Sequence, residues 1–172
     1  MAPMGDLVRR ARQVLLGLGW HHPFFLPAAA RVRIVEDPDA PTAYARADGL
    51  IALGPGYCRT LDGAQLAGVL AHELCHLLLA HAARRGGRDR ETWNHAADMT
   101  INEGLRRAGI TLPDGALYPP ADLRGQSAER IYDALARDAT VARDAQRQAD
   151  GSPGRGCAAR AAPDAGRGAV DG

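Results

Sequence analysis

The pentapeptide His72-Glu73-Leu74-Cys75-His76 lies inside a long apolar stretch and is the part of the sequence that best indicates fold and chemistry. In an α-helix, residues four apart lie on the same face, one turn above the other. His72 and His76 can therefore approach one metal ion from the same side, with Glu73 beside them to polarise a water on the metal. Zinc peptidases build their active sites from this His-Glu-x-x-His pattern.

The residues around the pentapeptide predict a buried helix. A chance occurrence of the pentapeptide need not lie in such a helix, so this context supports a functional motif. The helix is expected to run from about residue 61 or 62 to about residue 83, before Gly86 and Gly87 break it. Its apolar positions are Leu66, Val69, Leu70, Leu74, Leu77 and Leu78.

Upstream of this helix the sequence predicts one helix and a small sheet. Apolar residues recur at helical spacing over residues 6–18. Residues 31–36 are rich in β-branched side chains and predict a strand. Residues 43–46 and 50–53 flank Ala47-Asp48-Gly49, whose Asp-Gly pair is typical of a hairpin turn.

Downstream of the motif a second long helix is expected from residue 89–92 to about residue 108, with Gly109 after its end. A loop rich in proline follows, and residues 127–135 predict a short helix. Residues 138–172 are dominated by Ala, Arg, Asp, Gly and Gln. We therefore predict a folded domain over residues 1–137 and a low-complexity, disordered tail over residues 138–172.

A catalytic zinc site usually has three protein ligands and one open position, so a third ligand is needed after His72 and His76. Asp98 is our choice, because it lies on the second helix among Ala, Met and Ile residues and not in a charged run. His95, three residues earlier on the same face, is the alternative ligand, or a group that stabilises an oxyanion.

Other polar residues are weaker candidates for the site. His81 follows His76 by five residues, so on a continuous helix it would face away from the metal. Glu103 lies five residues beyond Asp98 and points to a different face. Asn94 and Asn102, four residues to either side of Asp98, are candidates for hydrogen bonds to the ligands. The competing interpretations are two histidines of an ordinary core, or a structural zinc site, although such sites usually have four ligands and favour Cys.

Composition excludes several classes of partner. The 172-residue chain has a formal net charge of +1, which gives no electrostatic case for binding nucleic acid or an anionic membrane. No apolar run approaches membrane-spanning length. Cys58, Cys75 and Cys157 form no Cys-x-x-Cys pair and, being odd in number, no disulfide framework. Reduced thiols and the lack of a convincing signal peptide favour a cytoplasmic protein.

Several segments, taken in order, resemble a bacterial metallopeptidase domain family whose members are often followed by a von Willebrand A-like domain. The matching segments are residues 47–49, 53–55, 69–81, 93–102, 112–115 and 127–132. The resemblance implies a zincin-like fold with His72 and His76 as zinc ligands, Glu73 as the catalytic acid and base, and Asp98 as third ligand. Two features depart from the pattern: no A-like domain follows in this chain, and His95 stands at a position expected to be apolar.

The expected fold is α+β and zincin-like. A small mixed or antiparallel sheet from residues 31–53 should pack on the helix that carries the motif, and the helix that carries Asp98 should cross beneath it. Residues 50–53 are expected to form an edge strand that binds an extended peptide by strand addition.

The expected activity is zinc-dependent hydrolysis of peptide bonds in a peptide or protein substrate, with one Zn²⁺ per chain and Glu73 as general acid and base. His95 or Tyr118 is expected to stabilise the oxyanion. The alternative is a catalytically inactive zinc-binding interaction module that works with a separate von Willebrand A-like or ATPase partner in trans.

Overall fold

The computed structural model describes residues 5–149, with side chains described up to residue 142. The chain divides into two units, Met1–Arg137 and Asp138–Gly172. Every residue of the candidate site belongs to the first unit. Within the described residues, no helix is both long and apolar enough to cross a membrane.

The first unit contains a mixed three-stranded sheet, formed by strands β1 (Arg33–Glu36), β2 (Ala43–Arg46) and β3 (Leu50–Leu53) in the order β1-β3-β2. β2 and β3 form the predicted antiparallel hairpin, and Gly49 supplies the positive φ of 80° in its turn. β1 pairs with β3 in parallel. The prediction that residues 50–53 form an edge strand is wrong, because β1 takes the far side of β3. The open edge beside the site belongs to β2.

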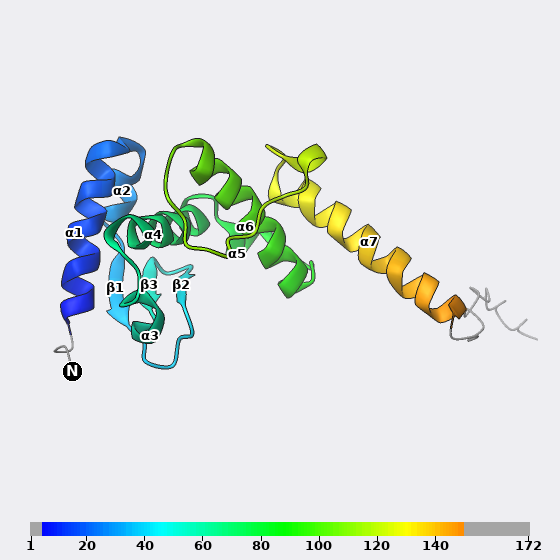
Figure 1. Cartoon of the computed structure of the whole chain (residues 1–172), viewed down its shortest axis with the longest axis horizontal. Coiled ribbons are helices and arrows are strands. Elements are labelled where there is room, and N and C mark those ends of the chain that lie inside the picture. Colours follow the sequence, from blue (N-terminus) through cyan, green and yellow to red (C-terminus); the bar gives the residue numbers. More distant parts are fainter. Residues whose placement is uncertain (1–4, 150–172) are drawn as a thin grey trace, which may run out of the picture. The chain divides into compact units, whose positions relative to one another are not determined.

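One face of the sheet is covered by helices α1 (Asp6–His21) and α4 (Gly63–Leu78), which pack against each other (Figure 1). Ile34, Ile51 and Leu53 point into this layer and are at most 5% exposed. Val35 and Tyr44, on the opposite face, are exposed. The fold is therefore α+β, with a small mixed sheet packed against the helix that carries the motif, as predicted.

Helix α4 begins with a capping box: Asp62 accepts a hydrogen bond from the Gln65 backbone N–H at 2.8 Å, and the Gln65 side chain accepts one from the Asp62 N–H. The helix ends at Leu78, five residues earlier than predicted. Ala80 takes a left-handed conformation with φ 51°, and the separate helix α5 (His81–Arg84) follows. A left-handed alanine has no signal in sequence patterns, because its β-carbon disfavours that conformation.

Helix α6 (Arg90–Arg107) begins after the N-cap Asp89 and is followed by Gly109 with φ 74°, close to the predicted bounds. Helix α7 (Ala128–Ala149) begins where expected and is longer than the predicted helix over residues 127–135. Its first residues meet α6 in a small cluster of Trp93, Ala97 and Ala128. Residues 138–149, predicted as part of the tail, lie in this helix; disorder of residues 150–172 stays a prediction, since they lie outside the described part of the chain.

Short helical turns connect the main elements: η1 (Pro23–Phe25), α2 (Leu26–Ala29), α3 (Pro55–Cys58) and η2 (Ala121–Leu123). The segment after α6 runs back across α4 at Gly68. A β-carbon at Gly68 would clash with the carbonyl oxygen of Thr111, so glycine allows this close approach. The crossing brings residues 112–117 over the motif.

Candidate metal centre

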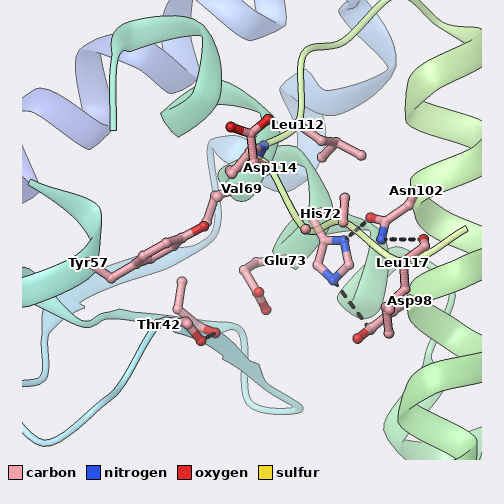
Figure 2. Close-up of a pocket in the computed structure, with 14 residues that line it drawn as sticks. Thr42, Tyr57, Val69, His72, Glu73, Asp98, Asn102, Leu112, Asp114 and Leu117 are labelled. Atoms are coloured by element: carbon pink, nitrogen blue, oxygen red, sulfur yellow. Dashed lines mark hydrogen bonds and ion pairs between the residues drawn. The ribbon is translucent and has the colours of Figure 1, made fainter. Parts of the chain in front are cut away.

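Three side chains from two helices converge on one point. His72 and His76 extend from the same face of α4, and Asp98 extends towards them from α6 (Figure 2 shows His72 and Asp98). His72 Nε2 lies 3.0 Å from His76 Nε2 and 3.4 Å from Asp98 Oδ1, and His76 Nε2 lies 3.1 Å from the same oxygen. The arrangement presents two imidazole nitrogens and one carboxylate oxygen to a shared position.

These spacings fit a bound metal ion. Two ligand atoms of a tetrahedral zinc site, each about 2.0–2.1 Å from the ion, are separated by about 3.3 Å. The three observed distances of 3.0, 3.4 and 3.1 Å lie close to that value. Three protein ligands also leave a fourth position for water or substrate. Among the described residues, His72, His76 and Asp98 are the group of His, Cys, Asp and Glu side chains close enough to share one ion.

The ionisation of Asp98 and His72 is coupled. Burial raises the pKa of Asp98, but hydrogen bonds from His72 and His76 outweigh it and hold that pKa well below its usual range. Burial lowers the pKa of His72, while Asp98 and the charge of Glu73 raise it, with a net increase. The carboxylate therefore stays ionised, as a metal ligand must be.

Asn102 fixes the orientation of His72. Its Oδ1 lies 2.8 Å from His72 Nδ1, and its amide nitrogen donates to the Leu117 carbonyl at 2.9 Å (Figure 2). Because the amide donates to Leu117, its oxygen faces the imidazole and accepts the Nδ1–H. A neutral His72 then has its lone pair on Nε2, the nitrogen that would bind a metal ion in place of the hydrogen bond to Asp98.

The remaining candidates fall outside the converging group. His95 and Asn94 are exposed, and Asn94 lines the wider part of the groove described below. Glu103 is buried and pairs with Arg106 at 2.9 Å. Tyr118, 40% exposed, lines neither part of that groove.

His81 lies where the sequence did not place it. Its ring nitrogens are not among the converging atoms, as predicted, but it does not point away from the site. The break at Ala80 folds the chain back, and His81 Nδ1 comes within 3.2 Å of His76 Nδ1. Burial, followed by the charges of His76 and Arg84, lowers the pKa of His81 to about 4. It is therefore a neutral imidazole at neutral pH.

Glu73 lies beside the converging atoms and faces the space between His72 and Thr42 (Figure 2). It is 7% exposed, and burial raises its pKa, while the nearby His72 and His76 lower it. The backbone N–H of Ala45, on β2, also hydrogen-bonds to it. A buried carboxylate with a raised pKa is suited to general base chemistry near neutral pH.

A groove passes the site in two parts. The narrower part, about 320 Å³, extends past Tyr57 and the loop at 112–117. The wider part, about 830 Å³, extends along β2 towards α5 and the start of α6. Both parts share Thr42, Ala43, His72, Glu73 and Asp98. His72 and Asp98 therefore lie where the two parts meet, His76 lines the wider part, and β2 forms one wall.

Sequence reasoning missed the groove walls. Tyr57 lines the narrower part from the one-turn helix α3, and its ring points into that space (Figure 2). Asp114 and Leu117 line it from the loop. Only the close approach at Gly68 could have placed that loop here, and it is not visible in one sequence.

Comparison with known proteins identifies the family. The family described as "Putative metallopeptidase domain" matches residues 7–170. The chain belongs to this family. No curated protein and no solved structure matches the chain. The converging residues of this metallopeptidase domain lie within the matched region, and together they could hold a metal ion.

Proposed function

We propose that this domain is a zinc-dependent peptidase of zincin-like architecture, with one Zn²⁺ held by His72, His76 and Asp98. The observation that carries the proposal is the convergence of three ligand atoms beside a buried glutamate, at the centre of a groove. Membership of the metallopeptidase family supports it. The set of two imidazoles and one carboxylate suits zinc in a catalytic site.

When bound, the ion would polarise the scissile carbonyl and lower the pKa of water towards about 7. Glu73 accepts the proton of the attacking water and donates it to the leaving amine. Its burial supports this role, because the raised pKa brings the protonated and ionised forms closer in free energy. The hydrogen bond from the Ala45 N–H orients the Glu73 carboxylate for these proton transfers.

The substrate binds as an extended peptide along the open edge of β2. Gly54 N–H donates to the Thr42 carbonyl at 2.6 Å, so by alternation Tyr44 and Arg46 also direct their backbone groups towards β3. The backbone groups of Ala43 and Ala45 then face the groove; the Ala45 N–H hydrogen-bonds to Glu73, so the Ala43 groups and the Ala45 carbonyl are left to pair with the peptide. Strand addition at this edge supplies main-chain hydrogen bonds without sequence specificity.

The wider part of the groove favours an acidic substrate side chain. Arg85 and Arg90 line it, and no salt bridge includes either of them among the residues whose side chains are described. The acids that line this part are Glu73 and Asp98, which belong to the reaction site. Guanidinium groups pair readily with carboxylates, so an acidic residue on this side of the scissile bond is preferred.

The Glu73→Gln variant tests the activity. The amide keeps the shape of the side chain but cannot take a proton, so the variant should bind zinc like the wild type and lose cleavage of a peptide library by at least about 100-fold. Cleavage at the wild-type rate in this variant would contradict the mechanism.

The same experiment decides between turnover and binding alone. Zinc bound by the wild type, with no cleavage in the library or of proteins from the native host, would favour the interaction module with a von Willebrand A-like or ATPase partner in trans. The activity is proposed for a cytoplasmic protein, because the described cysteines Cys58 and Cys75 are free thiols.

A further inference from the structure

His81 is a buried histidine that the proposed reaction does not use. It is 3% exposed, and its ring lies between those of His76 and Trp93, with centroids 5.2 and 6.0 Å away and near-perpendicular planes. Trp93 Nε1–H donates to the His81 carbonyl at 3.0 Å, and Arg84 donates to the Leu79 carbonyl at 2.9 Å. The turn that carries His81 is therefore held in place on both sides.

The contact between His81 and His76 restricts which nitrogens carry protons. The two Nδ1 atoms are 3.2 Å apart, so one must donate and the other accept. A neutral imidazole carries one proton. If His81 donates, the proton of a neutral His76 lies on Nε2, at the point where Asp98 and His72 converge. A metal ligand needs a lone pair there, so His76 must donate from Nδ1 and His81 must accept.

We propose that His81 is a positioning residue for the metal: its Nδ1 accepts the hydrogen bond from His76 Nδ1–H and so fixes His76 in the tautomer that presents its Nε2 lone pair to the ion. Asn102 does the same for His72 through its side-chain oxygen. Metal-bound histidines usually donate their second N–H to a carboxylate, carbonyl or water, and here a neutral imidazole takes that place. The inference rests on the metal-binding half of the proposed function and not on catalysis.

The second nitrogen of His81 supports this role. Among the described residues, His81 Nε2 is the buried side-chain nitrogen or oxygen without a hydrogen-bond partner. With Nδ1 as the acceptor, Nε2 carries the proton and remains unpaired, which is unfavourable in a buried position. The left-handed Ala80, which brings His81 back to His76, is a second unfavourable feature of the same turn.

Two variants of the full chain test the proposal through zinc affinity, measured by competition with a chromophoric chelator. His81→Leu removes the acceptor and should weaken zinc binding about 10- to 100-fold. His81→Asn can place its amide oxygen near the position of Nδ1 and should stay within about threefold of the wild type. His95→Leu, an exposed histidine on α6, is the matched control and should not change affinity.

An observation on the wild type keeps the test independent of folding of the variants. Long-range ¹H–¹⁵N correlation spectra of the zinc-loaded protein should show His81 protonated at Nε2 and His76 protonated at Nδ1. Either result would overturn the proposal: His81 protonated at Nδ1, or folded His81→Leu with wild-type zinc affinity. A wild type that binds no zinc also overturns it, whereas zinc binding without peptide cleavage contradicts only the proposed activity.

Discussion

Asn102 Oδ1 lies 2.8 Å from His72 Nδ1, and this contact connects α6 to the motif on α4. Asp98 lies one turn earlier on α6, so the helix that supplies a candidate ligand also orients another. The hydrogen bond from Asn102 to the Leu117 carbonyl extends the same network to the loop over the groove. A change at Asn102 should therefore alter both metal binding and the loop.

Asn102→Leu should weaken zinc binding about 10- to 100-fold, because a side chain of similar size can no longer accept the His72 N–H. The measurement is the zinc dissociation constant by chelator competition, with circular dichroism to confirm folding. Asn94→Leu is the matched control, since Asn94 is exposed on the same helix. Equal affinities in the two variants would contradict the role of Asn102.

The third ligand can be assigned by metal content. Elemental analysis of the purified wild type should give about one zinc per chain, and Asp98→Ala should lose it, because two imidazoles alone bind weakly. His95→Ala should keep it, because His95 is exposed and outside the converging group. Zinc lost from His95→Ala and kept in Asp98→Ala would reverse the assignment.

Local patterns predicted the elements better than their pairing. The hairpin turn at Gly49 and the start of the motif helix near residue 62 are encoded within a few residues, and the structure contains both. The parallel pairing of β1 with β3 is a contact between distant segments, so periodicity could not reveal that β3 is central. The prediction of an edge strand failed for that reason.

In the candidate site, too, local sequence predicted what lies on one helix but not what depends on contacts between distant segments. Helical spacing placed His72, His76 and Glu73 together, since they share one continuous helix. Asn94 and Asn102 have the same spacing from Asp98, and only the packing of α6 on α4 distinguishes them. His81 could not be placed, because its position depends on the left-handed Ala80.

A charge preference should appear once a cleaved peptide is found. Replacing an acidic residue of that peptide by Lys should lower kcat/KM in the wild type. The Arg85→Glu, Arg90→Glu double variant should instead cleave the Lys peptide with the higher kcat/KM. Rates are compared for the two peptides within each variant, which removes effects on folding. Arg12→Glu is the control, because Arg12 is exposed on α1 and does not line the groove. An unchanged ratio in the double variant would exclude Arg85 and Arg90 from recognition.

The ion pair of Arg84 with Glu129 should make the free energy of unfolding depend on pH in the acidic range. The hydrogen bond from Arg84, at 2.7 Å, lowers the pKa of Glu129. The stabilisation by this ion pair is therefore complete above the pKa of Glu129 in the unfolded chain, about 4.3. It is lost as the pH falls through the lower pKa of Glu129 in the folded protein. Both side chains are about one-third exposed, so the size is below about 1 kcal/mol.

Urea unfolding measures that contribution. Glu129→Gln should be less stable than the wild type at pH 6, and the difference should shrink towards pH 3. Asp122→Asn, which changes an exposed acid in η2, should show no comparable dependence on pH. A Glu129 difference that stays constant over this range would mean that the ion pair does not stabilise the fold.

Gly68→Ala and Gly104→Ala make the same change inside two helices and should have opposite effects. A β-carbon at Gly104 meets nothing within 4 Å, so alanine there should stabilise the protein by roughly 0.5–1 kcal/mol. At Gly68 the β-carbon clashes with the Thr111 carbonyl, and the overpacking should cost about 1–3 kcal/mol. Urea unfolding of the two variants shows directly whether each change raises or lowers the free energy of unfolding.

Because residues 112–117 follow the clash, Gly68→Ala should also disturb the narrower part of the groove and weaken substrate binding, measured as a higher KM. Stabilisation at both positions would mean that the loop does not pass over α4 at Gly68.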